Sequence, residues 1–365
     1  MKTAKNTIPQ PSRRHDSSDI LLRYASFLGC SDFHIKIDKA TGLKAIIAIN
    51  STKRGPAIGG CRMLPYQSTL KAFEDVFRLS YGMTLKAAIS NLPNGGSKSV
   101  LIQPKVIQDR EAYFAKFAEA VNELGGRYVV GADSGTGPEE MDIIARYSKY
   151  VTCTTATGDP SPYTALGVLR GIEASVKFKM GRASLEGVRV AIQGTGHIGY
   201  ELAKLLKDRG AQLIVCDTNK KHLDHCTQAM NVDVCSPEDI YDVPADVFAP
   251  CALGSVLNVH TIRRLKARII AGGANNQLTH AHYGKALHEK GFLYSPDFVI
   301  NAGGLIQAAM LYTHQNTPKA HQHIQEQIDH IYDTLSEIFE RSKKENIPTE
   351  DIATKIALER LSLNN

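Results

Sequence analysis

Several features that mark other classes of protein are missing from this sequence. Its seven cysteines are odd in number and form no C-x-x-C pair, so we expect reduced thiols in a cytoplasmic protein and no metal site. No apolar stretch approaches the roughly 18–20 residues that span a bilayer, so no membrane partner is expected. Lys and Arg number 43 against 37 Asp and Glu, and the net charge of +6 is spread without a basic run, which argues against nucleic acid as a partner.

Length and periodicity indicate an α/β protein of two domains. At 365 residues the chain is long enough for two separate cores, and residues 1–19 predict only a loosely packed extension. The cluster Gly158-Asp-Pro-Ser-Pro162 is the expected domain boundary. Helices are expected at 20–29, 69–83, 111–124, 164–179, 200–209 and 323–341, and strands at 33–37, 43–50, 99–102, 128–130, 188–193, 212–217, 247–250, 269–271 and 291–294.

A dinucleotide-binding motif follows the expected strand 188–193. The residues Gly194, Thr195, Gly196, His197, Ile198 and Gly199 lead into a helix and then a second strand that ends in Asp217. The glycines permit a tight turn and close approach of the backbone to a pyrophosphate, which rests on the helix N-terminus. The Asp217 carboxylate suits a ribose diol and would repel a 2′-phosphate, which favours NAD over NADP, although Lys220 and Lys221 lie close by.

Two lysines lie in the apolar stretch 82–102. Lys86 comes first, and Lys98 follows what we interpret as a Gly95-Gly96 turn ahead of an apolar run. A lysine that is buried or beside another cation loses its proton more readily and can then act as a general base. Its partner can stay charged and hold an anionic group of a substrate. On this stretch alone, the alternative of two solvated loop lysines stays open.

Collinear segments over roughly residues 20–360 resemble the leucine/phenylalanine/valine dehydrogenase branch of the amino-acid dehydrogenases. The matching segments are 55–63, 82–86, 95–98, 126–133, 160–165, 248–254, 274–277 and 299–304. The resemblance implies NAD-dependent, reversible oxidative deamination of an apolar L-amino acid to the 2-oxo acid and ammonia. It implies a homo-oligomer, a dimer or octamer, with the active site in a cleft between the two domains. Residues 1–157 would form a substrate-binding domain with a mixed sheet, completed by C-terminal helices in 330–365, and residues 158–329 a Rossmann-type domain.

The resemblance also implies roles for individual residues. Lys86 would hold the substrate carboxylate with the backbone of Gly59 and Gly60, and would repel the proton of Lys98. Lys98 would be the general base that activates the water attacking the iminium. Asp133 would exchange protons with the amino group and keep the two lysines in place. Without the resemblance, Asp133 in Ala-Asp-Ser-Gly is equally typical of a turn.

Cofactor and side-chain contacts follow from the same resemblance. The cofactor would meet Gly194, Thr195, Gly196, His197, Ile198, Gly199, Tyr200 and Asp217, with Thr164, Ala249, Cys251 and Asn275 on the nicotinamide side. Cys251 has apolar neighbours and no base, so we expect a packed thiol rather than a nucleophile. Ile58, Gly131, Leu305 and Ala308 would form the substrate side-chain pocket. Gly131 with Leu305 is the pair typical of phenylalanine-preferring relatives, and we expect a large apolar or aromatic-leaning specificity. Strict leucine or valine specificity stays open, whereas Ile58 offers no charge to a glutamate side chain.

Three departures from the family pattern stand out. Ser97 replaces a glycine, Ala132 replaces an acidic residue, and Ala309-Met310-Leu311 replaces a segment with two carboxylates. A second hypothesis is therefore a weakly active nucleotide-binding relative with a regulatory role.

Overall fold

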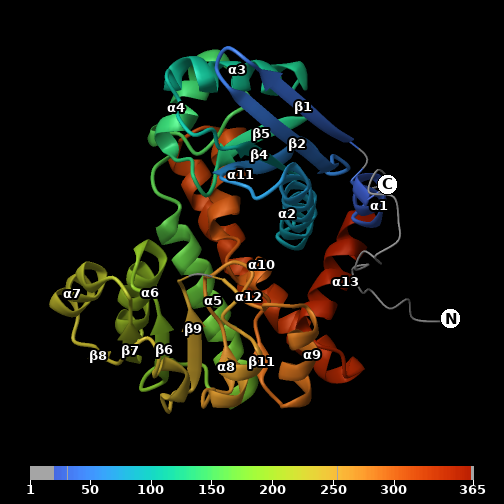
Figure 1. The fold of residues 1–365 in the computed structure, drawn as a ribbon. Helices are drawn as coiled ribbons and strands as arrows, with labels where there is room; N and C mark the ends of the chain where they lie inside the picture. Colours follow the sequence, from blue (N-terminus) through green and yellow to red (C-terminus); the bar gives the residue numbers. More distant parts are fainter. Residues whose placement is uncertain (1–19, 31, 253, 363–365) are drawn as a thin grey trace.

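The structure is a computed structural model that describes residues 20–30, 32–252 and 254–362, so the extension predicted for 1–19 lies outside it. Its two sheets lie at opposite ends of the molecule (Figure 1). The first has the order β1-β2-β4-β3-β5 and the second β11-β10-β9-β6-β7-β8. Among the described residues, no helix combines the length and apolar character that a bilayer crossing requires.

The first sheet is mixed, as expected. Its strands are β1 (Asp32–Asp38), β2 (Leu43–Ser51), β3 (Ala57–Leu64), β4 (Gly95–Ile102) and β5 (Tyr128–Ala132). β2 runs antiparallel to β1 and β4, while β3 is parallel to both β4 and β5. One face carries α2 (Thr69–Ile89) with α1 (Ile20–Phe27) beside it, and the other carries α3 (Arg110–Glu123) and α4 (Pro138–Tyr147).

The second sheet is entirely parallel. It contains β6 (Arg189–Gln193), β7 (Gln212–Cys216), β8 (Asp233–Val234), β9 (Val247–Pro250), β10 (Ile269–Ile270) and β11 (Leu293–Tyr294). α5 (Ser161–Met180), α6 (His197–Asp208) and α7 (Lys220–Ala229) pack on one face, and α8 (Val259–Arg264) and α9 (His282–Glu289) on the other. The strand order reverses between β6 and β9, which is where such sheets bind ligands, beyond the carboxyl ends of the strands.

Four C-terminal helices connect the two parts of the molecule. They are α10 (Asp297–Ile300), α11 (Gly303–His314), α12 (Pro318–Glu345) and α13 (Thr349–Ser362). α13 contacts α2 of the first sheet, as the resemblance implies, and Arg54 donates a 3.0 Å hydrogen bond to the Arg360 carbonyl. The apolar face of α12 instead packs on α5 and α11, because its isoleucines meet the apolar face that α5 turns away from the sheet.

Several local expectations were wrong. Gly95 and Gly96 do not form a turn but pair with β3 as the first residues of β4. β3 itself is not predicted, because Gly59 and Gly60 interrupt the apolar alternation that marks a strand. α5 begins at Ser161 and includes Pro162, a position where the first turn of a helix tolerates proline. The sequence pattern also does not predict β8, α4, α7, α8, α9, α10, α11 and α13.

Candidate active site

Lys98 and Asp133 form a buried ion pair at the first sheet. Lys98 lies on β4, and its Nζ is 2.5 Å from Asp133 Oδ2. The Lys98 side chain is 8% exposed, so this contact is largely removed from water. Asp133 directly follows β5, in a turn closed by a 2.9 Å hydrogen bond from the Thr136 amide to the Asp133 carbonyl. Asp133 is thus both a turn residue and a partner of the buried lysine.

Gly60 lies against this pair with no space for a side chain. A Cβ at Gly60 would stand 3.2 Å from Lys98 Nζ and 2.8 Å from Asp133 Cβ. Side chains alternate between the faces of a strand, so Ile58 and Gly60 of β3 share the α2 face with Lys98. The backbone at Gly60 therefore passes beside the two charged groups.

Lys86 lies in the last turn of α2 and reaches the other half of the molecule. Its Nζ donates to Asn301 Oδ1 at 2.7 Å and to Asn275 Oδ1 at 3.5 Å. Asn301 in turn donates to Asn275 Oδ1 at 2.8 Å. Asn275 is one of the residues predicted for the nicotinamide side. Lys86 therefore contacts a residue that was predicted to bind the cofactor.

Burial and the charges of the site shift two pKa values. Burial lowers the pKa of Lys86 to about 8, and the Lys98 cation acts in the same direction. Burial alone would raise the pKa of Asp133, but the cations of Lys98 and Arg62 outweigh it and hold that pKa at about 2. Asp133 is therefore an anion at neutral pH, and Lys86 titrates close to the physiological range.

The glycine-rich turn fits a dinucleotide. Gly194 has a φ of 96°, and a Cβ at Gly199 would stand 1.9 Å from the Gly194 carbonyl oxygen. At Gly196 the nearest atom to an added Cβ would be 4.0 Å away, which leaves open space above the N-terminus of α6. Asp217 accepts hydrogen bonds from the amides of Thr195 and Asn219, both at 2.7 Å, so its carboxylate is held beside the turn. His197 is exposed at the start of α6, and Tyr200 lies one turn further along.

Two more residues predicted for the nicotinamide side, Ala249 and Cys251, lie at the carboxyl end of β9. Ala249 is fully buried in β9, and the Cys251 amide donates to the Gln193 carbonyl at 2.8 Å. Burial raises the pKa of Cys251 to about 11, which agrees with a packed thiol. Thr164 of α5 donates to the Pro160 carbonyl at 3.1 Å. A Cβ at Gly273 would come within 2.8 Å of the Ile198 side chain, so this edge packs directly against the glycine-rich turn.

The residues predicted for the side-chain pocket come from both halves of the chain. A Cβ at Gly131 would stand 3.1 Å from Cys153 Sγ and 3.4 Å from a Thr152 methyl carbon. The Thr152 hydroxyl donates a 3.0 Å hydrogen bond to the Ala308 carbonyl, which ties this wall to α11. Ile58 is buried in the same core cluster against which Leu305 packs.

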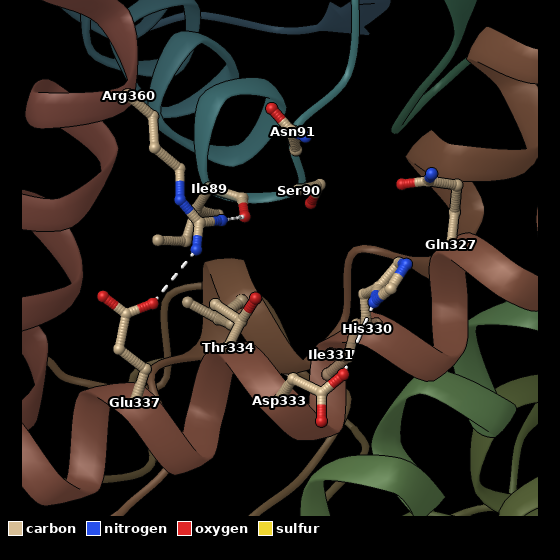
Figure 2. A pocket seen from close by; sticks show the side chains of 11 residues that line it. Ile89, Ser90, Asn91, Gln327, His330, Ile331, Asp333, Thr334, Glu337 and Arg360 are labelled. Atoms are coloured by element: carbon tan, nitrogen blue, oxygen red, sulfur yellow. Dashed lines mark hydrogen bonds and ion pairs between the residues drawn. The ribbon is translucent and has the colours of Figure 1, made fainter. Parts of the chain in front are cut away.

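A separate cavity of about 370 Å³ lies where α2, α10, α12 and α13 meet (Figure 2). Ile89 and Ser90, just beyond Lys86 in the chain, form one wall, and Thr334 and Glu337 of α12 form another. Arg360 donates to the Ile89 carbonyl and lies 3.2 Å from Glu337. None of the predicted site residues lines this cavity.

Two of the three departures from the family pattern lie away from the ion pair, whereas Ala132 directly precedes Asp133. Ser97 lies between Gly96 and Lys98 on β4, so its side chain points to the opposite face of the sheet from Lys98. Its hydroxyl is buried without a hydrogen-bond partner in the part of the chain that the structure describes. Met310 and Leu311 are buried in the main core cluster, where two carboxylates would lose their hydration. The apolar segment therefore suits its surroundings.

Two polar residues of the site were not identified from the sequence. Asn301 contacts Lys86, and Arg62 lies 3.2 Å from Asp133 Oδ2. Both belong to segments that carry the family resemblance. Asn301 is also a lone amide in the apolar run Val299-Ile-Asn-Ala302, which is a signal that could have identified it.

Comparisons with known proteins give matches over most of the chain. Residues 30–150 match the family described as Glu/Leu/Phe/Val dehydrogenase, dimerisation domain, and residues 212–364 match Glutamate/Leucine/Phenylalanine/Valine dehydrogenase. The chain is 45% identical to a leucine dehydrogenase of Thermoactinomyces intermedius, over 89% of each protein. It is 37% identical to a phenylalanine dehydrogenase of Caldalkalibacillus thermarum, over 94% of this chain and 92% of that protein. The crystal structure of L-tryptophan dehydrogenase from Nostoc punctiforme superposes with a TM-score of 0.84 at 38% identity, covering 94% of this chain and 99% of that one.

Proposed function

Because this chain belongs to the Glu/Leu/Phe/Val dehydrogenase family and is an amino-acid dehydrogenase, we propose that it deaminates an apolar L-amino acid, reversibly, to the 2-oxo acid and ammonia. The contact of Lys86 with Asn275 and Asn301 carries this proposal. It supports the proposal because it joins α2, which packs on the sheet that carries Lys98, to residues that follow strands of the second sheet.

Each charged group of the site has one role in the proposed reaction. Lys86 binds the substrate α-carboxylate together with the backbone amides of Gly59 and Gly60. Lys98 takes a proton from the water that attacks the iminium carbon, and Asp133 exchanges protons with the amino group. A bound nicotinamide would supply the acceptor for the hydride that leaves the substrate α-carbon. A lysine base contributes only in its neutral form.

The cofactor within the nicotinamide class is proposed to be NAD. The Asp217 carboxylate, held beside the glycine-rich turn by two amides, supports this choice because it can accept hydrogen bonds from both ribose hydroxyls and repels a 2′-phosphate. Gly194, Thr195, Gly196, His197, Ile198, Gly199 and Tyr200 would hold the pyrophosphate, and Thr164, Ala249, Cys251 and Asn275 the nicotinamide.

The substrate side chain is proposed to be large and apolar, with aromatic substrates at least competitive with leucine. Gly131 supports this, because it leaves the pocket wall without a methyl group, and Ala308 is also small. Leu305 opposes it by filling part of the volume. Leucine preference is the second candidate, supported by the 45% identity to a leucine dehydrogenase. One methylene group more or less in an apolar pocket changes the binding free energy by only about 1–3 kcal/mol. A broad apolar specificity is therefore compatible with both candidates.

The proposal extends to domains, assembly and location. Residues 1–157, completed by helices of 330–365, are proposed as the substrate domain, and 158–329 as the cofactor domain. The contact of α13 with α2 supports this division, whereas the packing of α12 on α5 and α11 opposes it for residues 330–345. A homo-oligomer is supported by β1, an edge strand that leaves Ile35 55% and Ile37 64% exposed. The seven free cysteines support a cytoplasmic location.

The test is a spectrophotometric assay of the purified chain with NAD and a panel of L-amino acids. We expect NADH formation with apolar side chains and none with glutamate. An intact protein that binds NAD but reduces it with no amino acid would contradict the proposal and favour a regulatory relative.

A further inference from the structure

The Asp133 carboxylate is shared between two cations. Its Oδ2 lies 2.5 Å from Lys98 Nζ and 3.2 Å from Arg62 Nε. The same guanidinium turns its NH1 to Asp75 Oδ2 at 3.0 Å. The Arg62 side chain is only 17% exposed, so both contacts are shielded from water. Two carboxylates fix the orientation of a planar guanidinium. They would not fix the orientation of a lysine ammonium, which lies on a flexible chain.

The position of Arg62 follows from the strand register. It is two residues after Gly60 on β3, so it extends from the same face of the sheet as Gly60. Asp75, on α2, is held in turn by the Tyr66 hydroxyl and by Arg78 NH2, both at 2.8 Å. A chain of alternating charges therefore runs from α2 through Asp75, Arg62 and Asp133 to Lys98.

We propose that Arg62 is a positioning residue for the deamination: it holds the Asp133 carboxylate in the orientation in which Asp133 meets Lys98 and the substrate amino group. This inference rests on the proposed function. Without Arg62, Asp133 could turn about its own side-chain bonds and would face Lys98 as its one close cation. The site would also lose one positive charge, and the loss of a cation moves the protonation of neighbouring groups to higher pH.

The charged groups that face this carboxylate come from three elements. Lys98 of β4 and Arg62 of β3 contact it, and Lys86 of α2 acts on it through space. Asp75 and Tyr66 act through Arg62, while Asp297 of α10 faces Lys86. Replacing Arg62 removes one of three nearby positive charges and leaves the other two in place.

The experiment compares Arg62→Gln and Arg62→Lys with wild type in the NAD-linked assay. We expect Arg62→Gln to lower kcat by about 10–100-fold, as misplaced catalytic groups do. We also expect it to move the acid limb of the kcat/KM profile to higher pH by about 1 unit, the effect of one lost neighbouring cation. Arg62→Lys should restore the position of the limb, because the charge remains, but only part of kcat.

Arg78→Gln is the matched control, because Arg78 contacts Asp75 but does not contact Asp133. Its pH profile should coincide with that of wild type. Equal profiles for Arg62→Gln and wild type, or a shift of the same size in Arg78→Gln, would overturn the inference.

A double-mutant cycle keeps the inference testable without turnover. Arg62→Gln and Asp133→Asn should shift Tm non-additively, because each removes the same contact. Additive shifts would overturn the role of Arg62 even in an active enzyme. A wild-type protein that deaminates no amino acid would contradict the proposed function, while the cycle would still decide whether Arg62 and Asp133 are coupled.

Discussion

Lys86 Nζ donates a 2.7 Å hydrogen bond to Asn301 Oδ1, and this contact joins the last turn of α2 to the residue that ends α10. The ammonium of the first sheet's helix is thus held by an amide from the second half of the chain. A substrate carboxylate at Lys86 would therefore lie beside Asn275 and Asn301, and the position of the substrate depends on how the two halves are placed.

Replacing the proposed base should abolish deamination. We expect Lys98→Ala to lower kcat by about 10²–10⁴-fold, the usual loss for a general base. NAD affinity should stay close to wild type, because Lys98 lies on β4, outside the glycine-rich turn. Steady-state rates and NAD titration by fluorescence measure the two effects. Lys105→Ala, an exposed lysine just after β4, is the control. More than about a tenth of the wild-type rate in Lys98→Ala would show that another group is the base.

Affinity for a carboxylate should fall in alkaline solution. Burial lowers the pKa of Lys86 from 10.5 to about 8, so its charge is present below pH 8 and is lost as the pH rises through that value. The inhibition constant of 4-methylpentanoate, which has the carboxylate but no amine, should rise about tenfold per pH unit above pH 8. In Lys86→Arg the guanidinium stays charged, and the constant should be flat to pH 10. A flat wild-type curve would remove Lys86 from carboxylate binding.

Cofactor choice should depend on Asp217. We expect wild-type kcat/KM to be clearly higher with NAD than with NADP, and Asp217→Ser to reduce this difference because the repulsion of the 2′-phosphate is gone. The double variant Lys220→Ala/Lys221→Ala is the control, since both lysines are exposed at the start of α7. If wild type used both cofactors equally and the control restored NAD preference, these lysines would be what accommodates the phosphate.

The hydroxyl of Ser97 should cost stability without serving catalysis. It is buried without a partner among the described residues, and such a group costs about 1–3 kcal/mol. Ser97→Ala should raise Tm by about 2–4 °C for each kcal/mol recovered and leave kcat unchanged. Ser99→Ala, on the same strand and face, should lower Tm because the Ser99 hydroxyl bonds that of Tyr128 at 2.8 Å. Calorimetry would contradict this account if both variants moved Tm in the same direction.

Substrate size should respond to Gly131. Gly131→Ala adds a methyl group to the proposed pocket wall and should shift kcat/KM from phenylalanine toward leucine and valine. The added carbon would lie 3.1 Å from Cys153 Sγ, which introduces strain as well as bulk. Gly131→Ala/Cys153→Ala removes the strain and separates the two effects. A wild-type kcat/KM for L-phenylalanine more than tenfold below that for L-leucine would contradict the aromatic-leaning pocket and favour leucine preference.

The elements with regular periodicity were predictable from the sequence. The glycine-rich turn and its flanking strands appear where expected, because strand, turn and helix depend on neighbouring residues. The predicted ranges of α2 and β4 were each several residues too short. For β4 the reason is that Gly95 and Gly96 have the local pattern of a turn. They lie in a strand because β3 pairs beside them and α2 packs on them, with Thr84 too close to Gly96 for any side chain.

The sequence by itself determined which residue types were available for this chemistry: two lysines in an apolar stretch, an aspartate at the end of a strand and a dinucleotide turn. The tertiary structure alone decided which of them meet. Lys98 on β4 contacts Asp133 after β5 because the strand between them, β3, carries Gly60 at this point and so no side chain separates them. Lys86 contacts Asn301 because α10 packs beside α2. These contacts join residues that are far apart in the sequence, so no local pattern predicts them. They follow from the order of the strands and from the packing of helices onto buried faces.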